Sequence, residues 1–305
     1  MTTISSSAPG RARAWVMAAR PATLPAAVAP VLVGTAVAVH VRHFRPLPFL
    51  AALVAAALIQ IGTNFANDLF DYHKGADTTA RLGPVRVTQS GLVSPRAVAR
   101  AMVLTFGAAV LVGLYLVAVG GLPILLIGLA SIAAAILYTG GPWPLGYHGL
   151  GDVFVFIFFG LIAVTGTYYV QAGTVGRGPH VSGEAIAAAV PVGLLVTAIL
   201  VVNNVRDIET DRAAGKRTLA VRLGRRASRV QYALLVATAY AVPLLLWLAH
   251  VTSWTFWLPW LTAPLAYQLI RTVSTHADGP TLNRALKGTG RLNLIFGLLF
   301  AASLL

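Results

Sequence analysis

The sequence predicts an all-α membrane protein, a polytopic helical bundle with nine transmembrane helices. Of its 305 residues, 57% are hydrophobic and only 10% are charged, whereas a soluble domain carries about 25% charged residues. The apolar residues form runs close to 20 residues, the length that a helix needs to cross a bilayer. Lys and Arg gather in alternate loops between these runs. Lipid is therefore expected to be the solvent for most of the surface.

The predicted spans follow one another with short connections. They lie near residues 21–40, 47–67, 97–118, 121–139, 151–171, 184–205, 228–249, 252–270 and 290–305. The first run has no convincing cleavage site, so we interpret it as a retained span and not as a signal peptide. We expect residues 1–20 to form a cytoplasmic tail and residues 21–305 to form a single transmembrane domain.

The positive charges predict the orientation in the cell membrane. Of the 23 Lys and Arg residues, 20 fall in the tail and in the loops after spans 2, 6 and 8, and the other side holds only Arg42, Arg45 and Arg177. Because cytoplasmic loops are enriched in Lys and Arg, the N-terminus and the loops after even-numbered spans should be cytoplasmic. Membrane orientation therefore explains the net charge of +14 better than nucleic-acid binding does.

An internal echo predicts a duplicated architecture. The second and sixth spans both end in Asn and acidic residues, then enter a basic loop that contains Arg-Leu-Gly at 81–83 and 222–224. Both loops end in a helix-start signal, Ser94-Pro95 in one and Ser228 in the other, since Ser favours the cap and Pro the first helical position. Two four-helix halves that face each other, with one extra helix, would bring the acidic ends together.

Six of the nine carboxylates lie in two short segments at these ends. The segments contain Asp68, Asp71, Asp77, Asp207, Glu209 and Asp211. At 100° per residue, Asn64, Asn67, Asp68 and Asp71 share one helical face, as do Asn203, Asp207 and Asp211, while Glu209 points elsewhere. Ionisable groups near membrane depth usually face a polar cavity or a partner.

Like charges on one helical face repel unless a cation neutralises them or one carboxyl stays protonated. Asp and Asn oxygens, without Cys or His at ligand spacing, suit Mg²⁺, which retains waters and bridges phosphates. Nearby basic residues could hold diphosphate oxygens: Lys74, Arg81, Arg86, Lys216 and Arg217. The alternative is that the acids pair with Lys74, Arg206 and Arg212. Arg222, Arg225, Arg226 and Arg229 are expected to set topology and to contact anionic lipid.

Three segments carry a resemblance to a known family. They are NFANDLFDYHKGADT (64–78) with the following GPVRVTQSG (83–91), YTGGPWPLGYHGLGD (138–152) and NNVRDIETDRAAGKRTLAVRLG (203–224). With them the chain resembles, over almost its whole length, the UbiA superfamily of intramembrane prenyltransferases. Within it the chain is most similar to the branch that prenylates 1,4-dihydroxy-2-naphthoate in menaquinone biosynthesis.

The resemblance implies a fold and an activity. The fold would be a nine-helix bundle around a central cavity that cytoplasmic loops cap. The activity would be Mg²⁺-dependent transfer of a polyprenyl chain from its diphosphate to the naphthoate, with loss of CO₂. The metal and catalytic residues would be Asn64, Asp68 and Asp71 in the first motif and Asp207 with Asp211 in the second, with Asn203 on the diphosphate. Position 75, where a periodic motif would continue with an acid, is Gly75.

Residues after the fourth span are candidates for handling the aromatic acceptor. Tyr138, Tyr147 and His148 could orient it, and Asp152 could move its proton. The alternatives are interfacial aromatics for the two tyrosines, an exposed loop position for His148 and a helix cap for Asp152.

Two other functions stay open from the sequence alone. One is the same chemistry on another acceptor, such as 4-hydroxybenzoate or homogentisate. The other is a cation-coupled transporter, whose intramembrane acids would bind ions. The acids here lie at predicted cytoplasmic helix ends beside basic loops, and this position favours diphosphate chemistry.

Overall fold

The computed structural model describes residues 10–76, 82–174 and 180–305, and every regular element within these ranges is helical. The all-α prediction is confirmed. In the first half of the chain the elements are α1 (Arg11–Ala19), η1 (Pro21–Thr23), α2 (Pro25–His40), α3 (Pro46–His73), α4 (Pro95–Gly120) and α5 (Leu122–Leu137).

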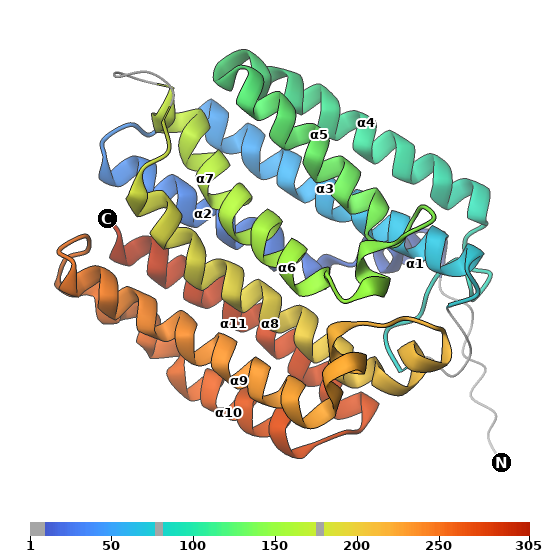
Figure 1. Cartoon of the computed structure of the whole chain (residues 1–305). Coiled ribbons are helices and arrows are strands. Elements are labelled where there is room, and N and C mark those ends of the chain that lie inside the picture. Colours follow the sequence, from blue (N-terminus) through green and yellow to red (C-terminus); the bar gives the residue numbers. More distant parts are fainter. Residues whose placement is uncertain (1–9, 77–81, 175–179) are drawn as a thin grey trace.

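The second half continues in the same way. A short turn η2 (Leu145–His148) precedes a helical stretch made of α6 (Gly151–Val155), η3 (Phe156–Ile162), α7 (Ala163–Tyr168) and η4 (Tyr169–Gly173), in which η3 and η4 are π-helical. Then come α8 (Gly183–Ala213), α9 (Leu219–Leu248), η5 (Trp254–Thr262), α10 (Ala263–Thr275) and α11 (Gly279–Ser303). Figure 1 shows the long helices side by side, all running roughly along one direction.

Helix starts follow local capping chemistry. The Ser94 side chain accepts the backbone N–H of Ala97, with Pro95 at the first helical position, as the sequence predicts. The Ser228 prediction is wrong, because α9 begins at Leu219 after the Thr218 cap, and Ser228 lies buried inside the helix. The sequence signal there marks an interruption in α9, at Gly224 (φ 79°), whose carbonyl accepts the Ser228 hydroxyl.

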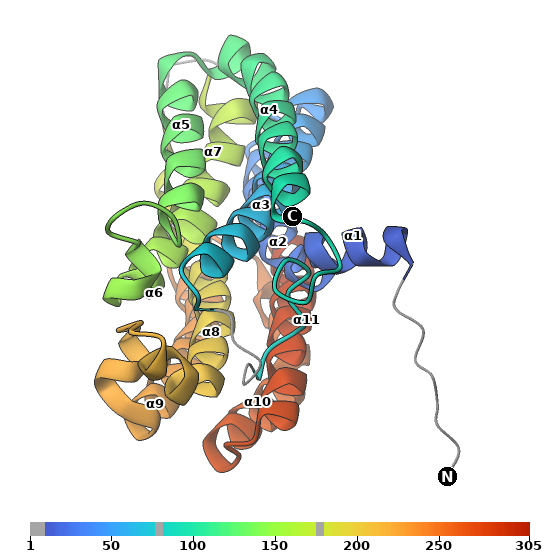
Figure 2. The same cartoon turned by 90° about the vertical axis from the view of Figure 1, so that its right-hand side faces the viewer.

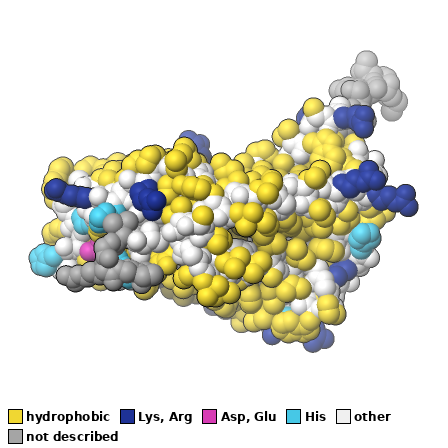
Figure 3. Space-filling view, turned by 90° about the horizontal axis from the view of Figure 1, so that it is seen from above, with side chains coloured by type: hydrophobic (Ala, Val, Ile, Leu, Met, Phe, Trp, Pro, Cys, Tyr) yellow, Lys and Arg dark blue, Asp and Glu magenta, His cyan; other side chains and the backbone are white. Residues whose placement is uncertain are grey.

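Several helices have the length and polarity of membrane spans. In the described part of the chain, five helical stretches qualify: α3, α4, residues 151–173, α8 and α9. The segment Arg11–Thr23 and α2 bend by 47° and together would make a sixth. Figure 3 shows the long face covered by hydrophobic side chains, with Lys and Arg toward its ends. This is the pattern of a multi-pass membrane protein, while the count of nine spans stays a prediction.

The predicted tail contains a helix that the sequence did not indicate. α1 turns away from the direction of α2 at one end of the bundle (Figure 2). Its buried Ala14 and Ala18 pack with Phe65 of α3, and the Trp15 ring meets the Phe65 ring edge-on with centroids 6.0 Å apart.

Small residues bring the central helices together. A Cβ added at Gly34 of α2 would lie 2.3 Å from the carbonyl oxygen of Val164, and one at Gly160 of η3 would lie 2.6 Å from the Cα of Gly193 in α8. The largest buried cluster accordingly joins α2, α7, α8, α9, α10 and α11. This packing fixes α8 beside the cavity described next.

The two acidic segments occupy the last turns of α3 and α8. Both helices end toward the right-hand side of Figure 1. Two motifs that are far apart in the sequence therefore meet at one end of the bundle.

Candidate active site

A cavity of about 500 Å³ opens between the helices that carry the two acidic segments. The described residues of its wall come mainly from α2, α3, α4, α5, the stretch 151–173 and α8, with only Leu286 from α11. The cavity therefore lies to one side of the bundle, and α9 and α10 pack outside its described wall.

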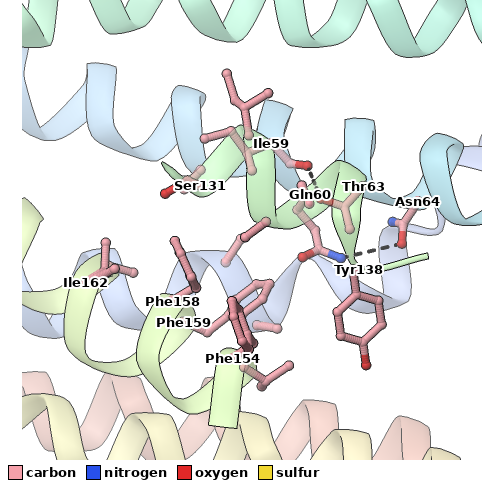
Figure 4. Close-up of a pocket in the computed structure, with 18 of the residues that line it drawn as sticks. Ile59, Gln60, Thr63, Asn64, Ser131, Tyr138, Phe154, Phe158, Phe159 and Ile162 are labelled. Carbon is pink, nitrogen blue, oxygen red and sulfur yellow. Dashed lines mark hydrogen bonds between the residues drawn. The ribbon is translucent and has the colours of Figure 1, made fainter. Parts of the chain in front are cut away.

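The cavity has a polar end and an apolar remainder. Polar side chains from the ends of α3 and α8 and from the adjoining loops line the first part. The remainder is bounded by apolar residues of α4, α5 and η3, among them Leu114, Leu129, Phe158 and Ile162. Figure 4 shows Phe154, Phe158 and Phe159 on one side of this space, opposite Ile59 and Ser131. Leu114 and Leu129 are more than half exposed although they line the cavity, so the apolar part is open and not sealed by packing.

Asp71 is the centre of the polar end. One carboxylate oxygen accepts from Arg86 at 2.8 Å, and the other accepts from Lys216 at 3.0 Å and from the Tyr147 hydroxyl at 2.8 Å. The three donors belong to three different connecting segments. Asp71 therefore gathers cations of both motifs at one point on the cavity wall.

Asp68 has a different environment. It is 1% exposed, it is absent from the described cavity wall, and its two oxygens accept the backbone N–H groups of Val87 and Thr88 at 3.2 and 3.3 Å. In this structure Asp68 holds the segment that carries Arg86. Its predicted role as a metal ligand stays a prediction.

Asn64 ties the N-terminal segment to α3. Its amide nitrogen donates to the Ala19 carbonyl and to the Thr23 hydroxyl, both at 2.9 Å, while Gln60 also donates to Thr23. Figure 4 shows Gln60, Thr63 and Asn64 on the same stretch of α3. These bonds fix Arg20, which has a left-handed backbone (φ 52°) and lines the cavity.

The end of α8 supplies the second acidic group. Asp207 and Asp211 line the cavity together with Asn203. The Arg206 guanidinium is 1% exposed and binds both oxygens of Asp207, with Nε to Oδ1 at 2.8 Å. Glu209 points outward, its side chain 65% exposed and paired with Arg212, as the helical geometry predicts.

The structure brings nine of the predicted site residues to the cavity wall. They are Asn64, Asp71, Arg86, Tyr138, Tyr147, Asn203, Asp207, Asp211 and Lys216. Five others lie off the described wall: Asp68, Lys74, His148, Asp152 and Arg217. Arg81 and Asp77 lie outside the described residues.

Residues off the wall have other contacts. Lys74 donates to the Gly141 carbonyl at 3.1 Å, and the exposed Arg217 donates its backbone N–H to the Tyr147 carbonyl.

The surroundings of Lys74 also change its pKa. Desolvation lowers the pKa of Lys74, the nearby Lys216 lowers it further, and Asp71 opposes both effects. The ammonium groups of Lys74 and Lys216 lie 5.0 and 4.7 Å from the Tyr147 ring centroid.

The acceptor candidates divide in a similar way. Tyr138 lines the cavity, and a Cβ added at Gly151 would meet its hydroxyl at 2.8 Å. The His148 ring instead stacks on Trp143, with centroids 4.1 Å apart. Asp152 is buried behind the wall and accepts from Gln231 at 3.0 Å.

Several cavity residues were not predicted as site residues. Asn67 accepts from Thr139 at 2.9 Å, and both line the polar end with Arg20, Thr23, Gln60, Asn204 and Thr218. The position of Asn67 on the same helical face as Asn64 and Asp71 was the available signal. Gln60 and Asn204 lie on α3 and α8 next to the predicted Asn64 and Asn203. Arg20, Thr23, Thr139 and Thr218 depend on how the segments between the long helices fold over the cavity, which no local pattern reports.

The donor set suits a hard divalent cation shared with a ligand. Among the described residues, no three His, Cys, Asp or Glu side chains form a ready-made metal cage. Mg²⁺ usually uses one or two carboxylates together with waters and substrate phosphates. Asp71 on α3 and Asp207 and Asp211 on α8, with amide oxygens beside them, supply at least that many carboxylates at one end of the cavity.

Comparison with known proteins identifies the family. The family model described as "UbiA prenyltransferase family" matches residues 27–299. The chain belongs to the UbiA prenyltransferase family.

Relatives of this UbiA family chain include a bacterial enzyme and archaeal structures. It is 42% identical over 296 residues to the 1,4-dihydroxy-2-naphthoate octaprenyltransferase of Escherichia coli (strain K12), covering 94% of each chain. A UbiA homologue from Aeropyrum pernix K1 has the same fold, with TM-score 0.70, 17% identity, and 92% and 98% coverage of the two chains. A homologue from Archaeoglobus fulgidus, bound to GPP and Mg²⁺, gives TM-score 0.66 at 14% identity, with 95% and 99% covered.

Proposed function

We propose that the chain transfers a polyprenyl group from polyprenyl diphosphate to 1,4-dihydroxy-2-naphthoate, with loss of CO₂, to form diphosphate and demethylmenaquinone in its reduced, hydroquinone form (demethylmenaquinol). The observation that carries the proposal is one cavity with two acidic helix ends at its polar part and a long apolar part beyond them. The relative from Escherichia coli, named for this donor and acceptor class, supports the choice of acceptor. The Archaeoglobus fulgidus homologue, bound to GPP and Mg²⁺, supports the choice of donor and metal.

The residues at the polar end would hold the leaving group. Arg86 and Lys216, both on the cavity wall, can donate to diphosphate oxygens as the allylic C–O bond breaks. Mg²⁺, held by Asp71, Asp207 and Asp211, would neutralise the charge that builds on the diphosphate.

The apolar part would protect the reacting carbon. Phe154, Phe158 and Phe159 (Figure 4) line a space with few water-binding groups, and an allylic cation survives only where water is excluded. Tyr138, which lines the cavity, would orient the aromatic ring. The ring carbon then bonds to the allylic carbon, and the carboxylate leaves as CO₂.

The arrangement in the cell membrane is part of the proposal. We infer nine spans, with the N-terminus and the loops around Asp71 and Asp207 on the cytoplasmic side, where a charged diphosphate is available. The excess of Lys and Arg in those loops supports this orientation.

The decisive experiment is mass spectrometry of the products. Purified protein in lipid nanodiscs should convert 1,4-dihydroxy-2-naphthoate and a polyprenyl diphosphate into a prenylated product that has lost the mass of CO₂. The reaction should stop in excess chelator and resume with Mg²⁺. Parallel assays with 4-hydroxybenzoate and homogentisate distinguish the acceptor, because preferred turnover of either would contradict the naphthoate assignment.

A further inference from the structure

A chain of hydrogen bonds connects the second acidic motif to the segment between α3 and α4. Arg206 of α8 donates through one terminal nitrogen to Oδ1 of Asn283 at 2.6 Å. Asn283 of α11 then donates through Nδ2 to the carbonyl of Leu82 at 2.7 Å. The sequence separations are 77 and 201 positions, so only the fold brings these groups together.

Arg206 connects the second acidic motif to the other members of this series of hydrogen bonds. Its guanidinium also binds Asp207 and donates to the Asn203 side chain at 2.9 Å. A buried guanidinium is stable only when its donors find partners, and its planar fork fixes their directions. One rigid guanidinium therefore fixes the side chains of Asp207, Asn203 and Asn283 relative to one another.

The segment at the other end carries Arg86 to the cavity. Within it, the Arg86 carbonyl accepts the Ser90 backbone N–H at 3.0 Å and the Ser90 hydroxyl at 2.7 Å. Asp68 binds the next two backbone N–H groups, as described above. Hydrogen bonds within the segment therefore fix the turn around Arg86. The position of this turn in the protein depends on the contacts that tie the segment to α3 and α11.

Leu82 is the anchor on the α11 side. Besides the hydrogen bond from Asn283, its side chain packs against the start of α11, where a Cβ added at Gly279 would lie 3.1 Å from the Leu82 Cβ. A shift of Leu82 would be transmitted through the three intervening residues to Arg86, which forms the 2.8 Å ion pair with Asp71.

We propose that Asn283 and Arg206 are positioning residues that couple the second acidic motif to the Arg86 segment and thereby set the affinity for the donor's diphosphate. This inference rests on the proposed function for its ligand. Asn283 does not line the cavity, so its effect on diphosphate must pass through Leu82 and Arg206.

The two hydrogen bonds of Asn283 can be separated by substitution. Asn283→Asp keeps an acceptor for Arg206 but loses the donor to the Leu82 carbonyl, while Asn283→Ala loses both. Lys287→Ala is the matched control, because Lys287 is exposed one turn further along α11 and lies off the described cavity wall.

The first measurement is hydrogen–deuterium exchange of the full chain in nanodiscs. Both Asn283 variants should accelerate exchange in peptides covering residues 82–93 by several fold, and Lys287→Ala should leave it at the wild-type rate. Unchanged exchange in both Asn283 variants would overturn the coupling. Thermal melting of each variant checks that the bundle is intact, and the single-group change in Asn283→Asp is the one least able to unfold it.

The second measurement is calorimetric binding of inorganic diphosphate in the presence of Mg²⁺. Asn283→Asp should weaken binding about tenfold without a change in Tm, a result that a purely structural role would not give. Equal affinity in the variant and the wild type overturns the inference. Wild-type protein that binds diphosphate but forms no prenylated product contradicts only the proposed function, whereas wild-type protein that does not bind it overturns both.

Discussion

Lys216 and Asp71 form an ion pair of 3.0 Å although 145 positions separate them in the sequence. Asp71 lies in the last turn of α3, and Lys216 follows α8, so this contact joins the two acidic motifs directly. Both side chains line the cavity. The polar end of the cavity is therefore assembled by tertiary contacts between two similar helix-to-loop segments.

Lys216→Ala should reduce prenyl transfer more than Lys74→Ala. The two ammonium groups lie at similar distances from the Tyr147 ring, but only Lys216 binds Asp71 and lines the cavity. We expect about tenfold loss in kcat/KM for Lys216→Ala, or about 1.4 kcal/mol, and less than threefold for Lys74→Ala. Equal losses would mean that proximity to Tyr147, and not contact with Asp71, decides the effect.

Asp207→Ala should abolish most activity, while Glu209→Ala should not. Asp207 faces the cavity, whereas the exposed Glu209 pairs with Arg212. Loss of Asp207 should cost roughly 3 kcal/mol of transition-state stabilisation, about a hundredfold in rate. Steady-state kinetics of the two purified variants, at matched Tm, measures the difference. Similar inactivation of both would contradict the helical-face geometry of α8.

Asp68→Ala should lower activity about a hundredfold, or roughly 3 kcal/mol, and loosen the segment that carries Arg86. The two backbone N–H groups of Val87 and Thr88 lose their acceptor, which is costly for buried groups. Hydrogen–deuterium exchange should rise at both positions. The Mg²⁺ concentration for half-maximal rate in Asp68→Asn separates the two roles, since direct ligation would raise it strongly and an anchoring role would leave it close to wild type.

Ser131→Phe should discriminate between donors of different length. Ser131 lines the apolar part of the cavity (Figure 4), and a phenyl ring there would occupy space needed by distal isoprene units. We expect turnover of long polyprenyl diphosphates to fall at least tenfold more than turnover of geranyl diphosphate. Leu104→Phe on the exposed face of α4 is the control, and an equal loss with both donors would argue against a tail site beside α5.

Reporter fusions should place the two ends of the bundle in different compartments. A reporter after Arg226 should be cytoplasmic, and one inserted at Arg42, in the turn between α2 and α3, should be external. A cytoplasmic signal from both would show that the orientation or the number of spans is wrong.

The acidic helix ends could be predicted from the sequence because their evidence is local. Asp71, Asp207 and Asp211 follow the period of one helical face, and the exposure of Glu209 follows from the same geometry. The start of α9 could not be predicted in this way. The helix begins at Leu219 and is interrupted at Gly224, and the prediction took Ser228, four residues after this interruption, as the N-cap.

Residues whose roles arise from tertiary contacts escaped prediction. Arg206 reads as a juxtamembrane charge in the sequence, yet it is among the most deeply buried side chains. Its partner Asn283 lies in a stretch with no motif, and their contact depends on how α11 packs on α8. The placement of Asp68 against Val87 and Thr88 likewise depends on the path of a connecting segment.

Gly160 and Gly193 are buried off the described cavity wall, and they determine how closely η3 approaches α8. At Gly160 and Gly193 the backbones of η3 and α8 touch, and any added Cβ would meet Gly193 itself or the ring of Phe156. A methyl group at either position would drive the phenylalanine-bearing π-helical turn toward α5 and narrow the space between them. Exchanges among the exposed hydrophobic residues of α4 and α5 should cost little stability, as surface substitutions usually do. Substitutions at this crossing, outside the cavity, would instead change which hydrocarbon fits inside it.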